Sequence, residues 1–142
     1  MKAAFSIFLC AMIFISCDEN SATESPGNGT WLLYEHGYSP GAGYITENVP
    51  AIPTQTLTLN PDGSLETTVT VWKKYKYYLI IEPGGGQRNV LALYEEKPSD
   101  PNPDLTEVNV GYNMVSDEDG NLKLYFRWCI EGCHMAFKRY GP

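Results

Sequence analysis

Beyond residue 28, the chain consists of short runs in which apolar and polar residues alternate, separated by turns rich in Gly, Pro, Asn and Asp. Alternation with a period of two places every second side chain on the same face of a β-strand. Tight connections at residues 61–63, 83–86, 116–120 and 130–132 each contain a Gly that can supply the positive φ of a hairpin turn. No segment carries a helical period over the length of an ordinary helix, so the chain is predicted to be all-β.

The tight turns predict that consecutive strands are antiparallel neighbours. Closing such a meander into a barrel removes the exposed edges that an open sheet would carry. We therefore predict an eight-stranded antiparallel up-and-down barrel. The predicted strands are residues 31–36, 54–60, 64–71, 74–81, 89–95, 106–115, 121–128 and 133–140.

Two connections in this scheme are long. Residues 37–53 contain three Pro and form a predicted lid over one end of the barrel. Residues 97–104 also contain three Pro, which makes this loop stiff and non-helical.

The N-terminal segment has the layout of a secretory signal. Lys2 is followed by thirteen uncharged, mostly apolar residues, then by Ser16 and Cys17. The apolar run is shorter than the ~18 to 20 residues that a membrane-spanning helix needs. We predict a cleaved signal at residues 1–16, a polar, acidic and flexible tether at 17–28, and a single domain at 29–142.

Composition limits the partners. Without Lys2 the chain keeps nine Lys plus Arg against seventeen Asp plus Glu, a net charge of −8, which repels nucleic acid and anionic lipid. The basic and aromatic segment 72–78 therefore predicts alternating core and solvent-facing side chains, not a nucleic-acid site. Ten Tyr and three Trp suit β-strands and also suit binding surfaces.

The residues Phe14-Ile15-Ser16-Cys17 resemble the lipobox of bacterial lipoproteins. The resemblance implies cleavage before Cys17, acylation of its thiol, and a lipid anchor in the bacterial outer membrane. Asp18 and Glu19 resemble acidic signals that send such lipoproteins to the cell surface. The alternative is an ordinary signal peptide cut elsewhere, with Cys17 a plain thiol.

If Cys10 leaves with the signal and Cys17 takes the lipid, Cys129 and Cys133 remain as a pair. An oxidising location favours a disulfide between them, which would stabilise one hairpin by about 2 kcal/mol. The alternative is a metal or redox site, for which only His134 lies nearby in the sequence.

Gly29-Thr30-Trp31 matches the G-x-W motif of the lipocalins. Residues 57–64 and 129–133 are similar to the second and closing hairpins of lipocalin-like lipoproteins from Bacteroides-type bacteria. The resemblance implies a barrel closed at one end by Trp31, with a basic residue of the last strand packed over its ring. No match to the T-D-Y motif of secreted animal lipocalins is present, so the resemblance implies the barrel and no particular ligand.

Which basic residue covers Trp31 depends on the register of the last hairpin. A three-residue hairpin that pairs Cys129 with Cys133 places Lys138 inside the barrel, whereas the family resemblance favours Arg139, and both stay open. On this register the interior set is Leu122, Leu124, Phe126, Trp128, His134 and Ala136. The exterior set is Tyr125, Arg127, Met135, Phe137 and Arg139.

No catalytic motif or metal-ligand spacing is present, so we expect a non-enzymatic protein without a cofactor or metal. Residues 84–86 are predicted to form a hairpin turn and residues 117–121 a solvated turn without the length of an EF-hand loop. The favoured hypothesis is a barrel that binds a small, largely apolar ligand, and the alternative is a barrel whose interior is filled by side chains. Its predicted lining is Tyr38, Tyr44, Trp72, Tyr75, Tyr77 and Tyr112.

The competing hypothesis is a surface module that holds a glycan or a protein partner through exposed aromatic residues. The candidates on the predicted outer face are Tyr78, Tyr125 and Phe137.

Overall fold

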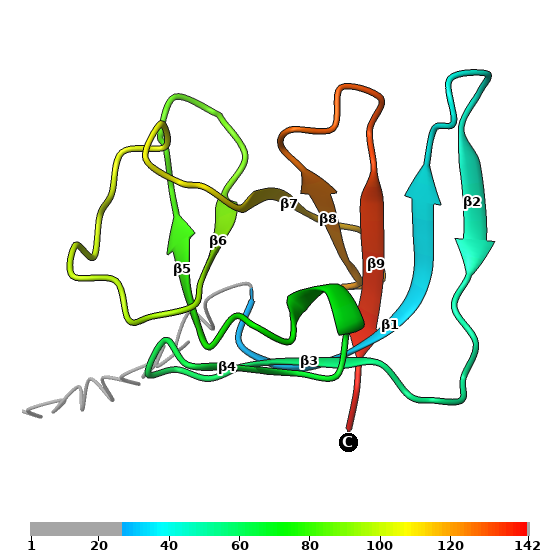
Figure 1. Ribbon diagram of the computed structural model, residues 1–142, viewed down its shortest axis with the longest axis horizontal. Helices are drawn as coiled ribbons and strands as arrows, with labels where there is room; N and C mark the ends of the chain where they lie inside the picture. The colour runs from blue at the N-terminus through cyan, green and yellow to red at the C-terminus, as the bar shows by residue number, and fades with distance from the viewer. Residues whose placement is uncertain (1–26, 142) are drawn as a thin grey trace, which may run out of the picture.

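The computed structural model describes residues 27–141, which form one antiparallel sheet curled into a nearly closed barrel (Figure 1). The predicted signal peptide, Cys17 and most of the predicted tether lie outside these residues. The strands are β1 (Gly29–Tyr38), β2 (Ile45–Asn48), β3 (Thr56–Leu59), β4 (Leu65–Thr67), β5 (Tyr77–Ile81), β6 (Val90–Tyr94), β7 (Gly111–Ser116), β8 (Leu122–Phe126) and β9 (His134–Arg139). One short 3₁₀ helix, η1 (Thr70–Trp72), follows β4.

The strands follow the order β4-β3-β1-β9-β8-β7-β6-β5, so all barrel strands that are consecutive along the chain are neighbours in space. The two ends of this order, β4 and β5, meet at a short seam. There Ser64 pairs with Tyr77, Leu65 N donates to Lys76 O at 2.8 Å, and Tyr78 N donates to Gly63 O at 2.9 Å. The predicted eight-stranded antiparallel up-and-down barrel is confirmed, with a ninth strand attached outside it.

The prediction that residues 37–53 form a lid loop is wrong, because this segment contains the end of β1 and the ninth strand. β1 continues to Tyr38, and β2 pairs with its last four residues, from Glu35↔Asn48 to Tyr38↔Ile45. All four β2 residues are exposed, and the β1–β2 hairpin stands beside the barrel in Figure 1. The turn residues between Ser39 and Gly43 were a hairpin signal, but β2 has no buried face and so lacks the apolar alternation that marks the other strands.

Seven of the eight predicted strands are shorter than expected, and three of them lose three or more residues at one end. Strand 64–71 ends at Thr67, because the Thr68 hydroxyl accepts a bond from Thr56 N at 2.7 Å and so replaces the ladder. The chain then turns through η1, where Trp72 N donates to Val69 O at 3.0 Å. Strand 74–81 begins only at Tyr77.

The third of these three strands is 106–115, which begins only at Gly111. The Asp104 carboxylate accepts bonds from Thr106 N and from the Thr106 hydroxyl, both at 2.8 Å. These bonds keep the start of the segment in a side-chain-capped turn.

The last hairpin has a different register from the one predicted. Tyr125 pairs with His134, whereas a three-residue loop would pair it with Phe137. The shift arises because Cys129 N bonds back to Phe126 O at 3.2 Å, which takes residues 127–129 out of the ladder. Since a shift of three residues is odd, it reverses the faces of β9.

As a result, Phe137 is fully buried inside the barrel beside Leu122 and Leu124. His134 and Ala136, predicted inside, belong to the opposite face of β9, and Trp128, also predicted inside, is 58% exposed.

The interior is filled across the middle of the barrel. The Trp72 indole, brought inward by η1, stacks on Phe137 with ring centroids 5.7 Å apart and meets the edge of Tyr112 at 5.1 Å. Large apolar side chains with almost no exposure surround this aromatic group, namely Leu57, Leu59, Leu91, Leu122 and Leu124. Burial on this scale supplies the main driving force for folding.

Candidate functional site

One end of the barrel is closed by the first and last strands. Trp31 is 2% exposed, and its Nε1 donates to Gly27 O at 2.8 Å. The Arg139 guanidinium lies 4.2 Å from the Trp31 ring centroid and also donates to Asn28 O. Because Trp31 is directly opposite Arg139 in the ladder, the structure places Arg139 over the ring, while Lys138 is exposed on the other face of β9.

On the other side of Trp72 the barrel contains a pocket of about 420 Å³, within the range of sites that hold small molecules. Its walls come from β1, β7, β8, β9 and η1 and from the connection between β2 and β3. The lining residues are Leu33, His36, Gly37, Val49, Pro50, Gln55, Val69, Thr70, Val71, Tyr112, Leu124, Phe126, Cys133, His134 and Met135.

The β2–β3 connection forms a wall because both of its ends are tied to β1. Val49 N donates to Tyr34 O at 2.8 Å, and Leu33 N donates to Gln55 O at 2.9 Å. These bonds flank the point between Leu33 and Glu35 where the β1–β9 register shifts. Such an irregularity bends a strand, and here it coincides with the part of β1 that lines the pocket.

The lining is mainly aliphatic and aromatic, and it contains no Lys, Arg, Asp or Glu. Its polar side chains are two histidines, Gln55, Thr70 and Tyr112, together with the disulfide-bonded Cys133. The Tyr112 hydroxyl accepts a bond from Trp72 Nε1 at 2.8 Å. Burial raises the pKa of Tyr112, so the phenol stays protonated at neutral pH.

The structure places only one of the six predicted ligand residues, Tyr112, in this pocket. Tyr38 and Tyr44 are exposed on the β1–β2 hairpin, because the predicted lid is a strand pair outside the barrel. Trp72 is in the core beneath the pocket, and Tyr75 and Tyr77 line smaller hollows elsewhere on the surface.

The residues missed by the sequence argument are the aliphatic ones, such as Val49, Val69 and Met135. Their sequence context does not distinguish them from core residues. The sequence feature that could have indicated the pocket was the threonine-rich segment 67–70, which interrupts the apolar alternation of the strand. There the chain turns across the barrel and brings Val69 to the pocket.

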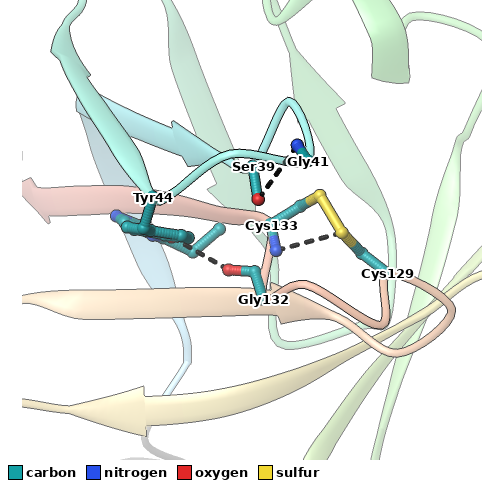
Figure 2. Close-up of a disulfide and its surroundings, with 7 residues drawn as sticks. Ser39, Gly41, Tyr44, Cys129, Gly132 and Cys133 are labelled. Carbon is teal, nitrogen blue, oxygen red and sulfur yellow. Dashed lines mark hydrogen bonds between the residues drawn. A yellow bond between two sulfur atoms is a disulfide. The ribbon is translucent and has the colours of Figure 1, made fainter.

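The predicted disulfide between Cys129 and Cys133 is confirmed, and it closes the loop of the β8–β9 hairpin (Figure 2). Figure 2 shows Tyr44, from the β1–β2 hairpin, lying beside this loop. The Tyr44 hydroxyl donates to Gly132 O at 2.9 Å and also contacts His134 Nδ1. The two hairpins are therefore tied together next to the pocket.

The His134 side chain connects this contact to Glu35 on β1. Its other ring nitrogen, Nε2, lies 2.9 Å from Glu35 Oε1, and Glu35 is 3.7 Å from the Lys123 ammonium. A side-chain carbon at Gly37 would collide with the His134 ring and the Tyr44 hydroxyl, so only glycine allows the two rings to stack here. Both ring nitrogens of His134 therefore already have partners. These are the Tyr44 hydroxyl of the neighbouring hairpin at Nδ1 and the Glu35 carboxylate at Nε2.

The predicted outer aromatic patch is wrong for two of its three residues. Tyr78 and Phe137 are buried, and Tyr125 is half-buried against His134. The exposed large side chains near the disulfide are instead Trp128 and Ile130, on the loop of the closing hairpin.

Comparison of the chain with family models, with curated proteins and with solved structures found no match. Within residues 27–141, no three His, Cys, Asp or Glu side chains form a group that could hold a metal ion. No helix in that same range has the length and apolar character needed to cross a membrane.

Proposed function

We propose that this protein is a lipoprotein of the bacterial outer membrane, exposed at the cell surface, whose lipocalin-like barrel binds a small apolar molecule without transforming it. The lipobox at residues 14–17 and the G-x-W sequence at 29–31 support the membrane and family parts of the proposal. The pocket supports the binding part.

The observation that carries the proposal is the position and lining of this pocket. It lies inside the barrel beyond the Trp72 core, and aliphatic side chains from separate strands converge on it. Val71, at its rim, is 63% exposed, although an apolar side chain gains by leaving water. A bound apolar molecule would cover Val71 together with the lining.

The test of binding is titration with N-phenyl-1-naphthylamine, a neutral dye that fluoresces in apolar surroundings. The chain from residue 17 onward, carrying Cys17→Ala, avoids detergent because it lacks both the predicted signal and the proposed lipid. We expect saturable binding that Thr70→Trp, which fills the rim, weakens at least tenfold. The matched variant Ser116→Trp, which adds the same ring at an exposed position of β7 outside the lining, should leave the affinity unchanged. Absence of saturable binding would refute the proposal.

The anchor is tested separately. The acidic composition offers no electrostatic attraction to anionic lipid, so membrane association should depend on acylated Cys17 alone. Cys17→Ala should move the protein from the membrane fraction to the soluble fraction of bacterial cells. Retention of this variant in the membrane fraction would contradict the lipoprotein proposal.

A second candidate function is a surface module for a glycan or a protein partner. Trp128 is 58% exposed and lies beside the Arg127 guanidinium, and Ile130 is fully exposed on the same loop. Exposed apolar groups that adjoin one another are typical of binding surfaces. A glycan array and an envelope pull-down, each repeated with Trp128→Ala, test this function, and empty results from both would exclude it.

A further inference from the structure

The charges around the pocket restrict what it can hold. With no Lys or Arg in the lining, the only lining residues able to carry a positive charge are His36 and His134. His36 Nε2 lies 3.1 Å from Glu47 Oε2, and His134 Nε2 lies 2.9 Å from Glu35 Oε1. Each imidazole is thus already matched by a carboxylate.

An anionic ligand would therefore meet no uncompensated positive charge. Removing an ionised group from water is unfavourable unless a partner replaces the lost hydration. The protein as a whole has a formal net charge of −7, which adds a long-range repulsion. A cationic ligand has no carboxylate in the lining to pair with, since Glu35 and Glu47 lie behind their histidines.

Of the three uncharged polar side chains that line the pocket besides the histidines, Gln55, Thr70 and Tyr112, only Tyr112 is buried. The Tyr112 oxygen accepts the Trp72 Nε1 proton, and among residues 27–141 no acceptor is found for the Tyr112 hydroxyl proton. Tyr112 is 8% exposed, so water reaches this proton poorly in the absence of a ligand. A hydroxyl whose oxygen already accepts one hydrogen bond donates its own proton more strongly.

We propose that the pocket selects neutral apolar molecules that carry a hydrogen-bond-accepting oxygen, that Tyr112 donates to this oxygen, and that ionised amphiphiles are excluded. This inference rests on the proposed binding function and adds the chemical class of the ligand.

The charge part is tested with two dyes that share one scaffold. N-phenyl-1-naphthylamine is neutral, and 8-anilino-1-naphthalenesulfonate is its sulfonated, anionic counterpart. We expect the neutral dye to bind the Cys17→Ala chain at least tenfold more tightly than the anion. Equal or tighter binding of the anion would overturn the inference and leave the proposed function standing. Binding of neither dye would refute the proposed function itself.

The Tyr112 part is tested by titration calorimetry with 2-acetylnaphthalene and with 2-isopropylnaphthalene, which has a similar shape but no oxygen. Tyr112→Phe should weaken binding of the ketone about fivefold to tenfold, the equivalent of one hydrogen bond, and change binding of the hydrocarbon less than twofold. An equal effect on both probes, or an effect on neither, would overturn the assignment of Tyr112.

Tyr94→Phe is the matched control, because the Tyr94 hydroxyl is buried without a partner in the described chain but lies outside the pocket lining. It should alter binding of neither probe. The carbonyl stretch of the ketone provides a second measurement that needs no variant. For the ketone bound to the Cys17→Ala chain it should lie below the frequency measured in a hydrocarbon solvent, and a band at the hydrocarbon frequency would contradict donation by Tyr112.

Discussion

Arg139 and Lys138 are adjacent basic residues, yet only Arg139 covers Trp31. The choice is made by the ladder, which sets Trp31 opposite Arg139 and Leu32 opposite Lys138. The planar guanidinium can lie on the indole face and still reach the Asn28 carbonyl. One residue of the last strand thereby holds the start of the domain against the closed end of the barrel.

We therefore expect Arg139→Ala to lower the free energy of unfolding by about 1 to 2 kcal/mol, because it removes the cation–π contact and the bond to Asn28. Lys138→Ala is the control, since Lys138 is exposed on the other face, and it should change stability by less than about 0.5 kcal/mol. Urea denaturation measures both. A larger loss for Lys138→Ala would contradict the closure assigned to Arg139.

At the β7–β8 turn, Asp117 accepts bonds from the Asn121 side chain at 3.0 Å and from Asn121 N at 2.8 Å, and these bonds lower the pKa of its carboxyl below the ordinary 3.8. Because this pKa is lower in the folded state, the contribution to stability is complete above pH 3.8 and is lost as the pH falls through the folded value. The urea midpoint of Asp117→Asn should lie below that of the unaltered protein at pH 7, and the difference should vanish in acid.

Glu118→Gln controls for the loss of a charge in the same turn, since the Glu118 side chain makes no hydrogen bond to the part of the chain that the structure describes. It should not reproduce the difference at pH 7. A midpoint difference for Asp117→Asn that stays constant from pH 7 to pH 2 would contradict the role of the carboxylate.

Among the elements, the two hairpins beside the pocket depend on each other. β2 has no buried residue, so the barrel does not hold it by apolar packing. Its hairpin is attached to the closing hairpin through the Tyr44 hydroxyl, which bonds to Gly132 O and contacts His134. The disulfide keeps that second hairpin in place, because it encloses Gly132 between its two cysteines (Figure 2).

Tyr44→Phe should therefore lower the free energy of unfolding by about 1 kcal/mol and speed amide exchange throughout β2. Tyr38→Phe is the matched control on the same hairpin, because among the described residues the Tyr38 hydroxyl bonds only to the exposed Glu47 carboxylate, at 3.0 Å. It should leave exchange in β2 almost unchanged. Hydrogen exchange read by NMR measures both variants, and equal effects would show that Tyr44 does not fasten the hairpin.

For the whole molecule, the weakest part of the barrel is its seam. β1 and β9 pair over six positions, whereas β4 and β5 share the single pair Ser64↔Tyr77 and two backbone bonds. The Tyr78 hydroxyl reinforces the seam by donating to Asn60 O at 2.7 Å. The free energy of local opening is lower where fewer hydrogen bonds must break together.

We expect the amides of Leu65 and Tyr78 to exchange with solvent faster than those of the β1–β9 ladder under native conditions. Tyr78→Phe should accelerate exchange at the seam and leave the β1–β9 ladder unchanged. The measurement is native-state hydrogen exchange resolved by residue. Uniform protection around the barrel would show that the seam is as stable as the other strand pairs.

Much of the barrel was predictable from local patterns. The strands that form the core carry period-two apolar runs bounded by turns, as in residues 57–59 and 122–124, and short connections leave adjacent pairing as the simplest arrangement. β2 was missed because a strand exposed on all sides carries no such pattern. The pocket lining other than Tyr112 was missed because its aliphatic residues have the composition of a core.

The sequence by itself determined the all-β class and the up-and-down order, because alternation and turn residues are local properties, and the predicted Cys129–Cys133 pair is confirmed. Only the tertiary structure decided that Arg139 covers Trp31, that Phe137 lies inside, and where a pocket remains. The turn from Phe126 to Cys129 shifts the last ladder by an odd number of residues. Because side chains alternate between faces, that one backbone turn decides which residues of β9 enter the barrel.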